Sequence, residues 1–318
     1  MIIADTRTKF SIALCKNTVY KNIFFYVTTP ASISFGMYCD IFFVGRKYNG
    51  HGDSSFNPRS ISIKNLRGMI MNKKILRINM KNTSVCYESD VPEYLHLGGR
   101  GLTSLIVSKE VPPTCHPLSS ENKIVFAPGL ISGSVMSSSN RLSAGAKSPL
   151  TGAIKESNSG GTVSIKLAKL GIKGIIIEEK PDSDAPFKGI LINKNGVQFI
   201  DFSDYKSLDT YDTAEKIIAD FGEKCGFMVI GFAGEMLLPT AAIGVSDIEG
   251  EPCRFLGRGG LGAVLGSKGI KAIIIDDEGS KSVIDGNTEA KNFIKKFTKI
   301  LKDNPVTVYS LSMELQLH

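Results

Sequence analysis

Residues 76–80 read Leu-Arg-Ile-Asn-Met, an alternation of apolar and polar side chains that is typical of a β-strand with one buried face. The polar residues 81–83 that follow predict a turn into a second strand. Further along, Asn195-Gly196 lies between apolar runs at 190–193 and 197–202, and this dipeptide favours the positive φ angles of a tight hairpin. The sequence therefore predicts two hairpins that are far apart along the chain.

Other segments predict more strands and a smaller number of helices. One helix is expected over 213–221, with Asp212 and Glu215 spaced as a capping box and Gly222 as a stop, and another over 288–302. Because the strands do not alternate regularly with helices, the sequence predicts an α+β fold with mixed β-sheets and few helices. The further strands are expected at 124–127, 174–178, 227–232 and 272–275.

Composition and charge exclude several classes of protein. The 318 residues are 42% hydrophobic and 22% charged, as in an ordinary globular protein. Nine basic and three acidic side chains lie within residues 1–68, so this segment holds six of the seven formal positive charges. It lacks a helical stripe of basic residues that would indicate an arm for nucleic acid or a membrane surface. We expect neither as a partner.

The first 70 residues also differ from the rest in character. They predict a poorly ordered basic extension, or sequence upstream of a true start at Met69 or Met71. No apolar run in them approaches the roughly 20 residues needed to span a bilayer, and no secretory signal is evident. The six cysteines and four histidines are scattered along the chain, without the close pairs of a zinc or iron–sulfur site. They predict reduced thiols and a cytoplasmic protein.

Four segments rich in glycine, arginine and small polar residues carry the chemical signal. Glycine lets the backbone approach a ligand closely, and arginine offers a planar fork to phosphate or carboxylate oxygens. Each segment alone is better explained as a tight turn with a solvated arginine. Together they predict an anion site for a large phosphorylated cofactor. The segments are residues 97–102, residues 137–148 around Arg141, residues 158–161 and residues 254–262.

Residues 257–262 also fit the Gly-x-Gly-x-x-Gly pattern of dinucleotide-binding folds, and Asp276 follows at the end of a strand-like run. The context argues against such a fold. Residues 250–254 do not read as a strand, and Gly266 and Gly269 interrupt the expected helix. We therefore do not expect a nicotinamide cofactor.

The order and the amino-acid sequences of these segments resemble those of the N-terminal domain of the tungsten-dependent aldehyde ferredoxin oxidoreductases. The resemblance covers residues 71–307. It implies a pterin-binding platform domain at 71–280 and the start of a further domain, cut short, at 281–318. The motifs that carry it are residues 73–79, 98–102, 117–123, 146–152, 158–161 and 257–268.

The resemblance also implies which residues hold the cofactor, a tungsten or molybdenum centre with two pterin dithiolenes. Asn158 and the backbone of Phe255 would bind a magnesium ion that bridges the pterin phosphates, and magnesium prefers such oxygen ligands. No catalytic residue is implied within this chain. The implied cofactor-binding residues are Arg141, Asn158, Gly160, Arg254, Phe255, Gly257 and Arg258.

Two departures from the family pattern stand out. Val163 and Ser164 replace a common Phe and Gly, and Lys166 replaces an acidic residue. The side-chain packing beneath the cofactor is therefore expected to differ from that of the family. Residues 308–318 no longer resemble the family. The family continues beyond this point with the cysteines of a four-iron cluster, whose ligands this chain lacks.

The family oxidises an aldehyde to its carboxylic acid with water and passes the electrons through an iron–sulfur cluster to ferredoxin. We expect this chain to be the tungstopterin- or molybdopterin-binding part of such an enzyme, inactive without the missing C-terminal domains. The alternative is a stand-alone pterin-binding or assembly subunit of a split enzyme, with its partner encoded downstream. Ferredoxin is the expected electron acceptor, and a homodimer is compatible with the resemblance.

Overall fold

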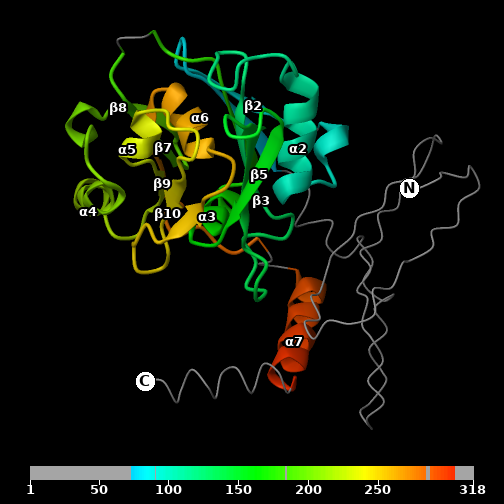
Figure 1. The fold of residues 1–318 in the computed structure, drawn as a ribbon. Helices are drawn as coiled ribbons and strands as arrows, with labels where there is room; N and C mark the ends of the chain where they lie inside the picture. The colour runs from blue at the N-terminus through cyan, green and yellow to red at the C-terminus, as the bar shows by residue number, and fades with distance from the viewer. Residues whose placement is uncertain (1–72, 90, 183–184, 284–286, 305–318) are drawn as a thin grey trace, which may run out of the picture. The chain divides into compact units, whose positions relative to one another are not determined.

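The computed structural model describes residues 73–304 except 90, 183–184 and 284–286. The predicted extension at 1–70 and the last residues of the predicted further domain, 305–318, lie outside the described residues. The described part contains two mixed six-stranded sheets and few helices (Figure 1). The predicted α+β class is therefore confirmed.

The first sheet has the strand order β2-β1-β6-β3-β4-β5. β1 and β2 pair antiparallel and form the first predicted hairpin, while β1 and β6 pair parallel. β4 and β5 pair antiparallel, and β5 is an edge strand. The strands are β1 (Lys74–Asn79), β2 (Ser84–Glu88), β3 (Ile124–Pro128), β4 (Leu142–Lys147), β5 (Ile154–Ser159) and β6 (Ile172–Glu178).

The second sheet has the order β11-β10-β9-β12-β7-β8. β7 and β8 form the second predicted hairpin, and β12 pairs parallel with β7 and antiparallel with β9. The strand expected at 227–232 is shorter than predicted, because Phe232 already begins a helix. The strands are β7 (Lys188–Asn193), β8 (Gly196–Asp201), β9 (Gly226–Val229), β10 (Ile243–Val245), β11 (Arg254–Leu256) and β12 (Ile270–Ile275).

The helices include both that the sequence predicts. α4 begins earlier than expected, and the side chain of Asp209, not Asp212, caps it by accepting from the backbone N–H groups of Tyr211 and Asp212. Gly222 ends this helix with φ 92°, as predicted. No helix in the described residues is long and apolar enough to cross a bilayer. The helices are α2 (Gly99–Glu110), α3 (Val163–Lys169), α4 (Thr210–Phe221), α5 (Phe232–Glu235), α6 (Leu261–Ser267) and α7 (Thr288–Lys302), with 3-10 turns at Pro92–Tyr94 and Ser203–Tyr205.

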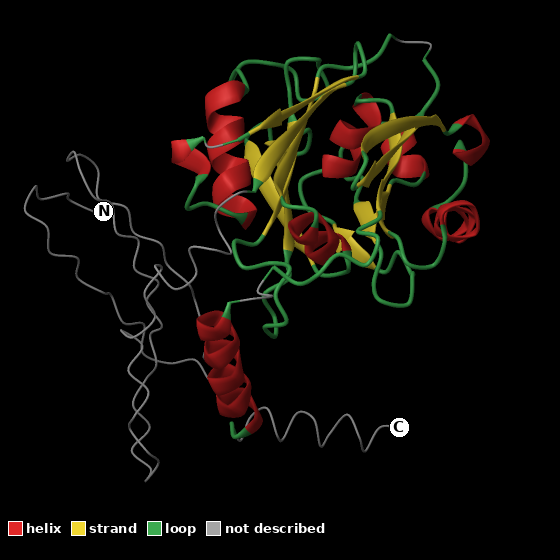
Figure 2. Ribbon diagram, turned by 180° about the vertical axis from the view of Figure 1, so that it is seen from behind, coloured by secondary structure: helices red, strands yellow, loops and turns green. Residues whose placement is uncertain are grey.

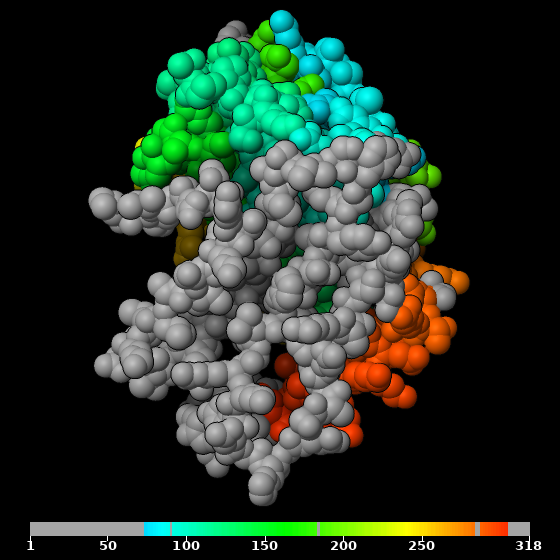
Figure 3. Space-filling view, turned by 90° about the vertical axis from the view of Figure 1, so that its right-hand side faces the viewer, coloured from blue at the N-terminus to red at the C-terminus, as the bar shows by residue number. Residues whose placement is uncertain are grey.

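The two sheets face each other across a core that α3 and α6 share with both of them (Figure 2). α2 covers the outer face of the first sheet, where Ile106 packs against Ile176, and α4 covers the outer face of the second. The residues of α2 contribute to the blue-green surface in Figure 3. Because the central strands are buried on both faces, they read as continuous apolar runs, as at Ile175 and Ile176 in β6.

The glycine pattern at 257–262 covers the loop after β11 and the first two residues of α6. A short strand does precede it, contrary to the sequence expectation, but β11 pairs antiparallel with β10. β10 and β9 are antiparallel, as are β9 and β12, so β11 and β12 run in opposite directions. A dinucleotide-binding unit needs a parallel crossover at this place. Gly262 serves helix packing instead, since a Cβ atom there would lie 2.4 Å from the carbonyl oxygen of Ala242.

Candidate functional site

The seven predicted site residues lie at neighbouring edges of the two sheets. β5 and β11 are the edge strands, and they contact each other. The backbone N–H of Arg258 donates to Ser157 Oγ in β5 at 3.1 Å. Ser148 Oγ donates to the carbonyl oxygen of Gly259 at 2.6 Å. The structure thus brings together two groups of residues that are about 100 positions apart, as the 101-residue separation of Ser157 and Arg258 illustrates.

Arg141 and Asn158 form a direct pair in the first sheet. Arg141 Nε donates to Asn158 Oδ1 at 2.5 Å, and Arg141 Nη2 reaches the backbone oxygen of Asn158 at 3.5 Å. Gly160 lies close by, because a Cβ atom added there would be 3.9 Å from Arg141 Nη1. The absence of a side chain at position 160 leaves the guanidinium group accessible to a ligand.

Glycines in the 257–260 loop have two different roles. Gly260 has φ 70°, and a Cβ atom there would lie 1.9 Å from the carbonyl oxygen of Pro239, so only glycine fits. At Gly257, by contrast, the nearest atom to an added Cβ would be the Cβ of Phe255, at 3.7 Å. Gly260 therefore fixes the loop against the protein, while Gly257 leaves open space over its backbone that a ligand can approach.

The electrostatics of this surface are set by three arginines. Arg141, Arg254 and Arg258 are exposed. Within the part of the chain that the structure describes, none of them belongs to an ion pair. An arginine without a carboxylate partner can offer its charge, and the donors that the chain itself does not use, to an anion from solution. The surface is therefore suited to phosphate or carboxylate groups.

One carboxylate, that of Asp247, lies in the loop before β11. It accepts a hydrogen bond from the thiol of Cys253 at 2.9 Å. This bond is the main cause that lowers the pKa of Asp247, with the nearby charge of Arg254 as a smaller cause. The same hydrogen bond raises the pKa of the Cys253 thiol. Asp247 therefore stays ionised close to Arg254 without forming an ion pair with it.

Oxygen donors for a divalent cation are also present. Asn158 offers a side-chain amide oxygen and Phe255 a backbone carbonyl on β11, and both residues are exposed. Magnesium accepts such neutral oxygens and takes its remaining ligands from phosphate and water. Asn158 and Phe255 thus offer, on two strands in contact, the kind of neutral oxygen donor that magnesium accepts. No group of three or more His, Cys, Asp or Glu residues among those described could hold a metal.

Two further residues, which the sequence did not single out, also belong to this cluster. Ser143 lies opposite Asn158 in the β4–β5 pair, and its Oγ accepts a hydrogen bond from Asn158 Nδ2 at 3.0 Å. Glu156 Oε1 accepts from Ser143 Oγ at 3.4 Å. The period of two along β5 puts Glu156 and Asn158 on one face, so strand alternation was the signal that could have found Glu156.

The segment 97–102 also reaches the cluster. It forms the N-terminal end of α2, which has Gly98 as N-cap and no side chain capping it. A Cβ atom on Gly99 would lie 3.5 Å from Ser143 Oγ, so this end of the helix covers the serine. The four glycine- and arginine-rich segments of the sequence thus meet in one region.

The residues that depart from the family pattern are well packed. Val163 is buried in the shared core. Ser164 Oγ donates to the carbonyl oxygen of Arg141 at 3.0 Å and supports the backbone of that residue. Lys166 forms an ion pair with Asp277 at 2.6 Å. The substitutions therefore leave the support beneath the predicted site intact.

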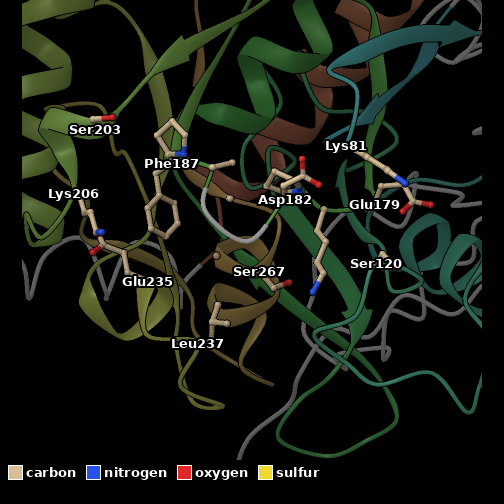
Figure 4. Close-up of a pocket in the computed structure, with 16 residues that line it drawn as sticks. Lys81, Ser120, Glu179, Asp182, Phe187, Ser203, Lys206, Glu235, Leu237 and Ser267 are labelled. Carbon is tan, nitrogen blue, oxygen red and sulfur yellow. The ribbon is translucent and has the colours of Figure 1, made fainter.

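A cavity of about 1090 Å³ is lined by other residues (Figure 4). None of the seven predicted site residues lines it. Its charged side chains are mixed in sign: Lys81, Lys180 and Lys206 with Glu179, Asp182 and Glu235. One of them, Glu235, is already paired with the buried Lys271.

Comparison with known proteins gives a consistent family match. Residues 75–277 match the family described as "Aldehyde ferredoxin oxidoreductase, N-terminal domain". A tungsten-containing aldehyde ferredoxin oxidoreductase of Pyrococcus furiosus is 34% identical over 237 residues, which is 73% of this chain and 38% of that protein. The enzyme of the same description from Pyrococcus horikoshii is 34% identical over 233 residues, 72% of this chain and 37% of that protein.

More distant relatives extend the match. The WOR-like subunit of an aliphatic sulfonate oxidoreductase from Pyrococcus furiosus is 26% identical over 220 residues, 64% of this chain and 34% of that protein. Among solved structures, the active site complex BamBC of benzoyl coenzyme A reductase with 1,5-dienoyl-CoA gives a TM-score of 0.61 at 29% identity. That match covers 67% of this chain and 31% of the other. The chain spans less than two fifths of the length of these proteins.

Proposed function

Because the chain belongs to the aldehyde ferredoxin oxidoreductase family, we propose that residues 71–280 form the cofactor-binding N-terminal domain of an enzyme of this kind. The observation that carries the proposal is the contact of β5 with β11, next to which lie three exposed arginines, 141, 254 and 258, that belong to no ion pair among the described residues. The cofactor is a tungsten or molybdenum centre held by two pterin dithiolenes. Relatives described as tungsten-containing support tungsten.

Each site residue has a proposed task. Arg141, Arg254 and Arg258 neutralise and orient phosphate oxygens of the pterins, because their forked donors match such groups. Gly160 and Gly257 leave room for the ligand to approach the backbone. The Asn158 amide oxygen and the Phe255 carbonyl hold a magnesium ion that bridges two phosphates.

The bound metal centre supplies the two-electron redox chemistry by which an aldehyde and water give a carboxylic acid. The residues of this chain bind and orient, and we assign no catalytic group among them. In such an enzyme the electrons would pass through a four-iron cluster to ferredoxin, and residue 281 would begin a further domain.

A second arrangement is also supported by a particular observation. One relative, from Pyrococcus furiosus, is itself described as a subunit. In this arrangement the chain is a separate pterin-binding or assembly subunit, which associates with a partner chain that carries the cluster. We further propose a cytoplasmic location, because Cys86, Cys115, Cys225 and Cys253 are free thiols.

The test is the cofactor content of the full 318-residue chain, produced anaerobically with tungstate and purified alone or with a candidate partner chain. We expect pterin, tungsten and magnesium to copurify with it. Arg258→Ala should lower the pterin content by about 10- to 100-fold, as loss of a charge-assisted bond of about 1.5–3 kcal/mol implies. Lys224→Ala, which removes an exposed charge from the loop after α4, is the matched control.

Retention of full pterin content by folded Arg141→Ala and Arg258→Ala variants would show that the site is assigned to the wrong residues. Cofactor that appears only after coproduction with a partner would favour the subunit arrangement.

A further inference from the structure

A chain of four side chains crosses the β4–β5 edge and ends at the predicted site. Its links are Glu156 to Ser143 at 3.4 Å, Ser143 to Asn158 at 3.0 Å, and Asn158 to Arg141 at 2.5 Å. The proposed function uses only Asn158 and Arg141. Glu156 and Ser143 therefore have no task assigned so far.

The two ends of this chain fix the direction of every hydrogen bond in it. The Ser143 hydroxyl donates its single proton to Glu156 Oε1. The serine oxygen is then left to accept, and the group of Asn158 that faces it must be the NH₂. At the other end Arg141 can only donate, so it requires the amide oxygen of Asn158. Both ends thus select the same orientation of the Asn158 amide.

The surroundings hold the serine in this role. Ser143 is 1% exposed, and the N-terminal end of α2 covers it, so water does not compete for its hydroxyl. The residue opposite Glu156 in β4 is Gly145. The Thr103 side chain of α2 fills the space over this glycine, since a Cβ atom there would lie 2.7 Å from Thr103 Cβ. Glu156 belongs to no ion pair within the described residues, so no cation draws it away.

We propose that Glu156 and Ser143 are positioning residues, which lock the Asn158 amide with its oxygen toward Arg141 and the bound magnesium and phosphate groups. The inference rests on the proposed function, since the magnesium ion needs that oxygen and would be repelled by the NH₂ group. Groups that orient a metal ligand in this way typically contribute about 10- to 100-fold to metal affinity.

The orientation is tested first on the full chain without cofactor, by NMR of the side-chain amides after selective ¹⁵N-asparagine labelling. Asn158→Asp identifies the Asn158 signal by its loss. In the native chain we expect slow exchange of one Asn158 NH₂ proton with water, because that proton is bonded to a buried hydroxyl. Ser143→Ala should accelerate this exchange about tenfold, which corresponds to one hydrogen bond of about 1.4 kcal/mol.

Glu156→Gln removes the obligate acceptor without changing the size of the side chain. The glutamine amide can either donate or accept, so only the Arg141 end still fixes the direction of the chain, and exchange should become faster than in the native protein. Thr213→Val is the matched control, because it removes another fully buried hydroxyl, that of a threonine in α4. It should leave the Asn158 signal unchanged.

The consequence for cation binding is tested by the magnesium-to-pterin ratio of the purified full chain. Ser143→Ala and Glu156→Gln should each lower it by about 10- to 100-fold. Asn158→Asp alone gives two carboxylates that compete for the single Ser143 proton. The double variant Glu156→Gln/Asn158→Asp reverses the chain, because the new amide at position 156 donates to Ser143 and Ser143 donates to the new carboxylate at position 158. It should retain more magnesium than either single variant.

Unchanged amide exchange in Ser143→Ala and Glu156→Gln would overturn the inference, as would a double variant that retains no more magnesium than Asn158→Asp. A native chain that carries neither pterin nor magnesium would instead contradict the proposed function, while the amide exchange would still decide the orientation.

Discussion

Cationic side chains are buried and paired in one region of the molecule and exposed in another. Lys268 and Lys271 are completely buried, and both are fully partnered. Lys268 Nζ donates to three backbone oxygens of residues 119–122, and Lys271 pairs with Glu235 and with the carbonyl oxygen of Leu208. The arginines at the β5–β11 edge are exposed and belong to no ion pair with any residue that the structure describes. A buried charge must find its partners within the chain, whereas a surface charge stays solvated until it binds a ligand.

The largest effect is expected at Lys271. Lys271→Met leaves the Glu235 carboxylate, which is 7% exposed, buried without its cation. The free energy of unfolding should fall by about 3–5 kcal/mol, as measured by urea denaturation. Lys224→Met, at an exposed position, should change it by less than about 0.5 kcal/mol.

A double variant separates the buried charge from simple loss of packing. Lys271→Met/Glu235→Leu should be more stable than Lys271→Met alone, since it removes the uncompensated carboxylate. Equal stability of the two would show that the pair does not have the role assigned to it.

The next effect is expected at Lys268, whose partners are neutral. Lys268→Met leaves the carbonyl oxygens of Ser119, Ser120 and Asn122 without this donor. We expect a loss of about 2–3 kcal/mol in the free energy of unfolding, because each unpaired buried polar group costs about 1–3 kcal/mol and water can reach part of the loop. A loss as large as that in Lys271→Met would contradict the difference between the two lysines.

A half-buried charge cluster between β1, β3, β6 and α2 should give an intermediate, pH-dependent effect. Burial alone raises the pKa of Glu110, but hydrogen bonds from Arg77 and Lys123 outweigh it and lower this pKa from 4.5 to about 2. The stability from this group is therefore complete above pH 4.5 and is lost as the pH falls toward 2.

The expected loss over that pH range is about 1–2 kcal/mol, allowing for solvent screening of a carboxylate that is 21% exposed. Denaturation at a series of pH values measures it. Glu110→Gln should flatten the dependence between pH 4.5 and 2, and an unchanged slope in this variant would refute the assignment.

The smallest effect on stability is expected at the exposed arginines. Arg141→Ala, Arg254→Ala and Arg258→Ala should each change the free energy of unfolding by less than about 0.5 kcal/mol, because none of them has an ion-pair partner in the described part of the chain. Thermal denaturation of the three variants checks this. A loss above about 1 kcal/mol would mean that the arginine supports the fold.

The sequence predicted those parts of the fold that local patterns determine. The hairpins at β1–β2 and β7–β8 follow from alternation and from Asn195-Gly196. α2 and α6 escaped prediction because Gly98, Gly99 and Gly101 look like a loop, and because α6 is buried on nearly all sides and so shows no amphipathic period. β5 is polar along most of its length, and its pairing with β4 is a tertiary property.

For the same reason, the candidate site could be predicted from the sequence only in part. The glycine and arginine segments are visible in the sequence as separate loops, and the resemblance to a family singled out seven residues in them. Their meeting depends on the approach of β5 to β11 across two sheets, which no local pattern encodes. Ser143 looks like an ordinary small residue of a buried strand until its register partner, Asn158, is known.

The most direct test of the central claim is a calorimetric titration of the full apo chain with magnesium pyrophosphate, a probe that carries the same anionic groups as the pterin phosphates. The native chain should bind it, and the triple variant Arg141→Ala/Arg254→Ala/Arg258→Ala should bind it at least about 100-fold more weakly, since several charge-assisted bonds are lost. Equal affinity in the two proteins, with both folded, would contradict the claim that the unpaired arginines form an anion site.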